Sequence, residues 1–182
     1  MTQRQWSVLV TMITVGAGLW PGASARAEPE WNACAMMQKA DLDAAFSPRV
    51  FEPGAPGREK VTGSAKLAAV SSCTFTSRGG SGKDGLTVTL VARRAPSDTT
   101  GVTPAVARAG AIQLKASPVD LVGLGEGAYW VNMGSSAFPV IQLNVFRGRR
   151  DWLVFGAAGK KLDTTAALAG LTTVARATAA RP

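Results

Sequence analysis

Short β-rich runs joined by tight turns are the feature that most restricts how this chain can fold. The run 86–93 (LTVTLVAR) alternates apolar and polar side chains at a period of two, which is typical of a strand with one face toward a core. The run 72–77 (SCTFTS) precedes it across a glycine-rich turn, 78–85. Strands joined by so short a turn pair antiparallel, so the sequence predicts a β-hairpin here.

Hydrophobic patterns and capping residues predict further strands and helices in the rest of the chain. Three further strands are predicted in meander order, at 128–133, 140–147 and 151–157. Helical spacing and N-terminal capping residues predict three helices, at 37–46, 103–112 and 164–178. The stretch 52–64, rich in proline and glycine, is interpreted as a surface loop. We therefore expect an α+β fold: a mainly antiparallel sheet of about five strands with three helices packed on it.

The first 27 residues have the layout of a cleavable secretory signal peptide. Arg4 supplies the basic start, the run 6–20 is uncharged and apolar, and Ala25 and Ala27 form the A-x-A pair that a signal peptidase accepts. The alternative is a retained N-terminal anchor. The early glycines and the break at Pro21 argue against it. The apolar run is also short for a stable membrane span.

The remaining segment, 28–182, is expected to be a single exported domain in the periplasm or outside the cell. It has no run of 18 apolar residues, so we expect no membrane span after cleavage. Lipid anchoring is not expected, because Cys34, the first cysteine, lies seven residues beyond Ala27. Removal of Arg4 and Arg26 takes the net charge from +8 to +6, which favours anionic surfaces without naming one.

The chain has two cysteines, Cys34 and Cys73. In an oxidising compartment, an even pair with no third thiol indicates a structural disulfide. A reactive thiol would need a neighbouring histidine or a C-x-x-C partner, and the sequence has neither.

The chain also contains no histidine. This removes the commonest general base near neutral pH and the commonest transition-metal ligand. With both cysteines paired, zinc, copper and haem sites have few ligands left, so no cofactor is expected. Carboxylates remain, and we interpret them as solvated surface groups: Glu28 and Glu30, Asp41 and Asp43, Asp120 and Glu126.

Two glycine-rich strings are interpreted as turns. The string 79–83 lacks the first glycine of a phosphate-binding P-loop and leads into a predicted strand where a P-loop has a helix. The string 123–127 is followed by Ala128, where a dinucleotide-binding G-x-G-x-x-G motif has its last glycine.

Basic residues gather most densely at the predicted turn after 140–147. The candidate contacts for an anionic ligand or partner are Arg147, Arg149 and Arg150, with Tyr129 and Trp130 as candidate aromatic contacts. The alternative is solubilising charge at a turn. Nucleic acid is not an expected partner, because the basic residues are dispersed and no row of aromatic residues is interleaved with them.

Three segments carry a resemblance: 34–46 (CAMMQKADLDAAF), 72–76 (SCTFT) and 123–130 (GLGEGAYW). Together they resemble a group of small, uncharacterised bacterial envelope proteins. In that group a cysteine before a short helix pairs with a cysteine in a C-T-[YF] strand, and a G-L-G-[DE]-x-A-[YF]-[WFV] segment opens a later strand. Many members look like lipoproteins, whereas this chain lacks the acylated cysteine. The resemblance supports the disulfide and an exported domain, and implies no activity.

The sequence thus favours an exported, non-enzymatic binding or accessory protein of the bacterial cell envelope, acting on an unknown envelope partner or anionic ligand. The alternative is a histidine-free, metal-free, carboxylate-dependent hydrolase acting on envelope polymers. Two buried carboxylates facing a cleft would favour the hydrolase. An exposed apolar patch or an open sheet edge would favour the binding protein.

Overall fold

The computed structural model describes residues 31–57, 69–77, 85–160 and 162–181. The predicted signal peptide, 1–27, and the hairpin tip, 78–84, lie outside the described residues, as does the second half of the predicted loop. The elements in chain order are α1 (Ala33–Met36), α2 (Lys39–Ala45), β1 (Ala55–Pro56), β2 (Ala69–Thr76), β3 (Thr87–Arg94), α3 (Pro104–Gln113), β4 (Val119–Leu121), β5 (Gly127–Asn132), β6 (Val140–Arg147), β7 (Asp151–Ala158) and α4 (Thr164–Ala179).

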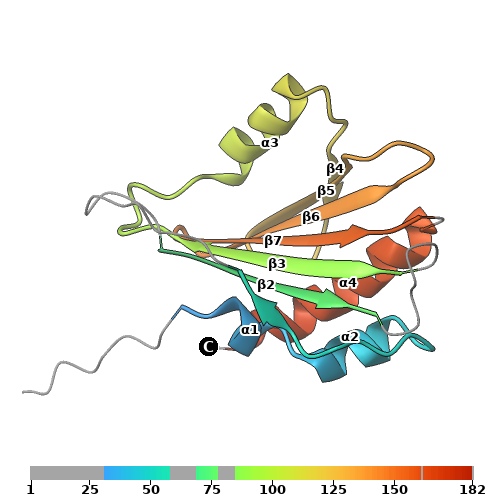
Figure 1. Cartoon of the computed structure of the whole chain (residues 1–182). Helices are drawn as coiled ribbons and strands as arrows, with labels where there is room; N and C mark the ends of the chain where they lie inside the picture. Colours follow the sequence, from blue (N-terminus) through green and yellow to red (C-terminus); the bar gives the residue numbers. More distant parts are fainter. Residues whose placement is uncertain (1–30, 58–68, 78–84, 161, 182) are drawn as a thin grey trace, which may run out of the picture. The chain divides into compact units, whose positions relative to one another are not determined.

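The strands form one sheet in the order β1-β2-β3-β7-β6-β5-β4, and each neighbouring pair is antiparallel. The predicted hairpin and the predicted meander are both present. They are joined through β3 and β7, which pair from Thr87 with Ala158 to Arg94 with Asp151. The two groups of strands therefore share one continuous sheet (Figure 1).

The α+β class and the antiparallel sheet are confirmed, but the expected numbers of elements were wrong. The described residues form seven strands and four helices, where about five and three were expected. The additional elements are α1, β1 and β4, of four, two and three residues. Elements this short span no more than about one and a half periods of a helical or alternating pattern, so hydrophobic periodicity does not reveal them.

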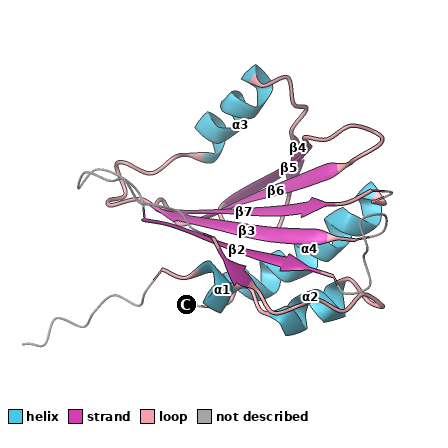
Figure 2. Ribbon diagram, viewed as in Figure 1, coloured by secondary structure: helices cyan, strands magenta, loops and turns pink. Residues whose placement is uncertain are grey.

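One face of the sheet is covered by α1, α2 and α4 (Figure 2). Asp163 caps α4 by accepting a hydrogen bond from the Ala166 backbone N–H at 2.9 Å, and α4 buries Leu171, Val174 and Ala175. These side chains meet fully buried strand residues such as Leu90, Leu143 and Phe155. The main hydrophobic core therefore lies between this face and the three helices.

The opposite face is different, because α3 alone among the described helices lies over it, across β5 (Figure 1). α3 begins as expected, with Thr103 accepting a hydrogen bond from the Val106 N–H and Pro104 in the first turn. No residue of α3 is buried. This helix therefore packs only loosely against the sheet. Within the described chain, no helix is long and apolar enough to cross a bilayer.

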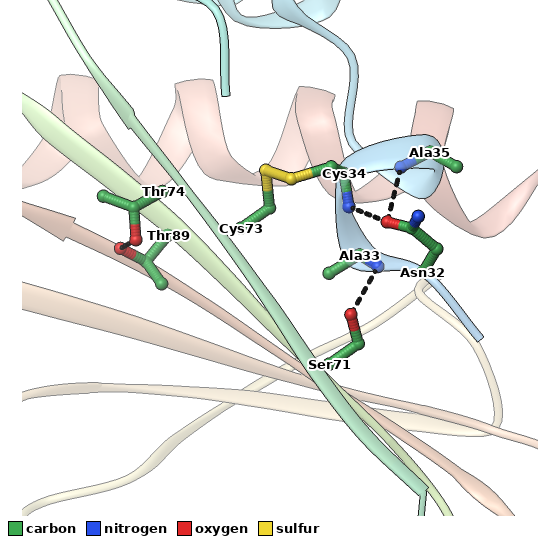
Figure 3. The surroundings of a disulfide bond; sticks show 8 residues. All are labelled: Asn32, Ala33, Cys34, Ala35, Ser71, Cys73, Thr74 and Thr89. Atoms are coloured by element: carbon green, nitrogen blue, oxygen red, sulfur yellow. Dashed lines mark hydrogen bonds between the residues drawn. A yellow bond between two sulfur atoms is a disulfide. The ribbon is translucent and has the colours of Figure 1, made fainter. Parts of the chain in front are cut away.

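The predicted disulfide is present between Cys34 and Cys73, with an S–S distance of 2.00 Å (Figure 3). It joins α1 to β2. A hydrogen bond from the Ala33 backbone N–H to the Ser71 side-chain oxygen, at 3.0 Å, runs beside it. Asn32 caps α1 through its side-chain oxygen, which accepts from the Cys34 N–H at 2.9 Å. The short α1 is thus held to the sheet by a covalent bond and a backbone anchor.

Candidate functional site

A groove runs between α3 and the face of the sheet that α3 only partly covers. Its volume is about 440 Å³. The floor comes from β5, β6 and β7, and one wall comes from α3. The lining residues are Ala107, Gly110, Ala111, Gln113, Leu114, Tyr129, Val131, Met133, Gln142, Asn144 and Trp152.

The groove exists because α3 presents small residues to the sheet. Ala107 and Ala111 pack against Tyr129, Val131 and Phe146. Gly110 has no side chain at all, and a Cβ built at this position would meet nothing within 4 Å. Such short side chains cannot fill the space between a helix and a sheet, so a volume large enough for a small molecule remains.

Three polar side chains meet at the floor. Asn144 accepts two hydrogen bonds at its Oδ1, from the Trp152 indole Nε1 at 3.1 Å and from the Gln142 Nε2 at 3.2 Å. An indole N–H can only donate, so this contact fixes which end of the Asn144 amide is oxygen. The other end, Nδ2, is buried and has no acceptor among the described residues.

The position of Trp152 is fixed by neighbours on both sides in the sheet. Its ring stacks on Phe146, with centroids 5.7 Å apart and 13° between the planes. The guanidinium of Arg93 lies over the same indole, 4.8 Å from the centroid. Tyr129 continues the row, stacking on Phe146 at 6.4 Å. The aromatic floor is therefore held in place independently of α3.

Tyr129 is the titratable side chain among the groove-lining residues. Burial raises the pKa of its phenol, against the smaller opposing effect of the Arg108 charge. Tyr129 is therefore neutral near pH 7, and the lining carries no formal charge at that pH.

Large apolar side chains stand exposed at the mouth of the groove. Leu114 is 72% exposed and Met133 is 45% exposed. Val106 and Ile112 of α3 are also more than half exposed, although they are not among the lining residues. α3 is tethered to the next strand through Arg108, which donates to Asp120 at 3.0 Å and to the Pro118 carbonyl at 3.3 Å. This ion pair is itself solvent-exposed, so it holds α3 only weakly.

The predicted aromatic contacts Tyr129 and Trp130 lie on opposite faces of the sheet, because they are consecutive residues of β5. Tyr129 is buried at the groove. Trp130 is half-buried and packs against the core beneath the other helices. The structure therefore does not bring these two side chains together at one surface.

The three predicted arginine contacts differ in their surroundings. Arg147 donates to Asp151 at 3.2 Å and to the Arg181 carbonyl at 2.7 Å. Arg150 is half-buried, and its Nε donates to the Ala95 carbonyl at 2.9 Å. Arg149 is exposed at the β6–β7 turn. Two of the three guanidinium groups thus contribute to internal contacts, and Arg149 presents its charge to solvent.

The candidate carboxylates that the structure describes do not line the groove. Asp41 pairs with Arg181, and Asp43 pairs with Lys39 on the same short helix. Asp120 and Glu126 are exposed, while Glu28 and Glu30 lie outside the described residues. The groove lining contains none of these carboxylates. In the described part of the chain, no three histidine, cysteine, aspartate or glutamate side chains lie close enough to hold a metal ion.

Asp151, which sequence reasoning did not single out, is the most buried carboxylate described, with its side chain 8% exposed. It accepts from both Arg94 and Arg147. Burial alone would raise its pKa, but the hydrogen bonds and charges of Arg94 and Arg147 outweigh this effect and hold the pKa of Asp151 below its usual value. Arg94 also lies over the Trp31 ring at 4.0 Å. None of the residues of this cluster lines the groove.

Apart from Tyr129, sequence reasoning also missed the groove-floor residues. A signal was present in the strand 140–147, where the polar residues Gln142 and Asn144 alternate with Ile141, Leu143 and Val145. Polar side chains at alternate positions of a buried strand share one face. That pattern indicates a polar site on a covered face, but not which element covers it.

No family model, curated protein or solved structure matches this chain.

Proposed function

We propose that this protein is an exported, non-enzymatic binding protein of the bacterial cell envelope, and that the groove beneath α3 holds one small, largely apolar molecule. The observation that carries the proposal is the groove itself: an apolar space of about 440 Å³ with a preformed aromatic floor and a small polar cluster. Small-molecule sites have volumes of about 300–1,000 Å³ and this same composition.

The exposed apolar rim supports the same reading. Leu114 and Met133 line the groove while remaining 72% and 45% exposed to water. Covering them with an apolar ligand would remove apolar surface from water, a gain of roughly 25 cal/mol for each Å² buried. This gain is available only in a bound state, so the rim favours a binding role.

The hydrolase alternative finds less support. A carboxylate-dependent hydrolase needs a pair of carboxyl groups at a cleft, one of them with a raised pKa. Among the described residues the groove lining carries no carboxylate, and the pKa values of Asp41 and Asp151 are lowered by their arginine partners. These two groups suit charge pairing better than proton donation.

The proposal that the protein is exported has three supports. These are the signal-peptide layout of residues 1–27, the resemblance to small envelope proteins, and the Cys34–Cys73 disulfide, which is typical of oxidising compartments. Periplasmic or secreted location is part of the same proposal.

Gly110 offers a direct test of the groove. The probe is N-phenyl-1-naphthylamine, a neutral apolar molecule whose fluorescence rises on leaving water. Gly110→Leu extends a side chain from a wall position where there is open space, so it should fill the groove without displacing the core. Gly110→Ala is the matched control, since it adds one methyl group and favours the helix.

We expect the purified protein to bind the probe, Gly110→Ala to bind it equally, and Gly110→Leu to bind at least about tenfold more weakly, as for the loss of a well-filled apolar contact. Thermal unfolding should show both variants folded. Absence of probe binding by the unchanged protein, or equal binding by Gly110→Leu, would remove the groove from the proposal.

A further inference from the structure

The unpartnered amide end of Asn144 indicates what kind of molecule the groove accepts. Asn144 is 0% exposed, and its Nδ2 has no hydrogen-bond acceptor within the described part of the chain. Leaving a buried N–H donor unpaired costs roughly 1–3 kcal/mol. Buried polar groups are paired in most proteins, so an orphan donor beside a binding groove is a functional signal.

The amide cannot relieve this cost by turning over. A flip would place Nδ2 where Oδ1 now accepts from Trp152 and Gln142, and donors would then face donors. Trp152 is in turn held between Phe146 and Arg93. The orientation of the free N–H is thus set by side chains on three neighbouring strands, β3, β7 and β6.

We propose that the ligand is a molecule with an apolar body and a carbonyl oxygen, and that this oxygen accepts a hydrogen bond from Asn144 Nδ2. This inference rests on the proposed binding function and names its ligand class. A carbonyl group matches the site, because the lining residues are uncharged near pH 7 and a neutral acceptor needs no counterion. The aromatic and aliphatic lining would surround the rest of the molecule.

Asn144 is covered in the structure described, so a ligand can reach its amide only if a neighbouring element shifts slightly. α3 is the element suited to such a shift. None of its residues is buried, and its ion pair to Asp120 is exposed. Loosely packed elements of this kind open at low free-energy cost.

Benzophenone and diphenylmethane provide the test, because they share two phenyl rings and differ by one carbonyl oxygen. Each would compete with N-phenyl-1-naphthylamine for the purified protein. We expect benzophenone to bind about tenfold more tightly, the effect of pairing one buried donor. Asn144→Leu should abolish the difference, whereas Asn132→Leu, at an exposed asparagine that does not line the groove, should retain it.

The carbonyl inference can be tested even if the Asn144→Leu variant does not fold. In the unchanged protein, the side-chain amide resonance of Asn144 should shift in ¹⁵N–¹H spectra with benzophenone and not with diphenylmethane. Equal affinity for the two compounds, with displacement of the probe by both, would overturn the carbonyl inference and leave the groove-binding proposal standing. If the unchanged protein does not bind the probe at all, both the carbonyl inference and the groove-binding proposal are overturned.

Discussion

Arg181 forms a bidentate ion pair with Asp41, although 140 positions separate the two residues in the chain. Its Nη1 donates to Oδ2 at 2.6 Å and its Nη2 donates to Oδ1 at 2.9 Å. Nη1 also donates to the Met36 carbonyl at 2.8 Å. One side chain following α4 therefore holds both α1 and α2, the two elements that precede the sheet.

Loss of this contact should destabilise the fold. Arg181→Gln removes the charged donor, and we expect the free energy of unfolding at pH 7 to fall by about 1.5–3 kcal/mol, as for hydrogen bonds to charged groups. Urea unfolding measures the change. Arg149→Gln, at an exposed turn, is the control and should change stability by less than about 0.5 kcal/mol. Equal effects of the two substitutions would contradict this role.

The same pair predicts a dependence on pH. The hydrogen bond from Arg181 holds the pKa of Asp41 below its ordinary value, against the effect of burial. A lowered folded-state pKa gives stability that is complete above the unfolded value, about 3.9, and is lost as the pH falls through the folded pKa. Stability should therefore decline below about pH 4. Arg181→Gln should show a shallower decline in acid unfolding curves.

Substitution of Asp151 should lower the free energy of unfolding more than substitution of Asp41 or Arg181. Asp151 is nearly buried between Arg94 and Arg147, so Asp151→Asn removes the carboxylate charge that both guanidinium groups contact. We expect a loss of about 3–5 kcal/mol, typical of breaking a buried charge pair from one side. Asp120→Asn, which breaks the exposed pair with Arg108, should cost less than about 1 kcal/mol. Calorimetry of both variants would compare them directly.

The disulfide should matter more for stability than for binding. Cys34 and Cys73 are 39 positions apart, and closing a loop of that length stabilises the folded state by up to about 4 kcal/mol in the chain-entropy model. The double variant Cys34→Ala with Cys73→Ala should unfold at lower urea concentration. Its affinity for N-phenyl-1-naphthylamine should be unchanged, since neither cysteine lines the groove. Loss of probe binding by a folded variant would contradict that separation.

The sequence predicted the larger elements because each carries a complete local signal. The alternation in 86–93 and the Asp163 cap before α4 depend on neighbouring residues alone. The groove depends on residues distant in the chain, since Gly110 lies on α3 while Asn144 and Trp152 lie on two later strands. Nothing local to the run 104–113 shows which face of the sheet it will cover. Charge clustering at 147–150 pointed to a turn whose arginines are mostly used within the fold.

Processing of the N-terminus is a separate prediction. Cleavage after Ala27 would give a mature protein that begins at Glu28. Intact-mass spectrometry of protein recovered from the cell envelope should show this start. A mature pool that retains Met1 would contradict the signal peptide.

Arg149 provides the test of whether the basic turn contacts an anion. Its side chain is exposed, whereas Arg147 and Arg150 also donate to carbonyl groups of the fold. If the turn binds an anionic partner, Arg149→Ser should lower the salt concentration that elutes the protein from a heparin column, with no change in unfolding. Exposed charge contacts are screened by ions, so the difference should vanish at high salt. Arg147→Ser should instead reduce stability, because Asp151 and the Arg181 carbonyl would lose a donor. Elution of Arg149→Ser at the same salt concentration as the unchanged protein would assign this arginine to solubility alone.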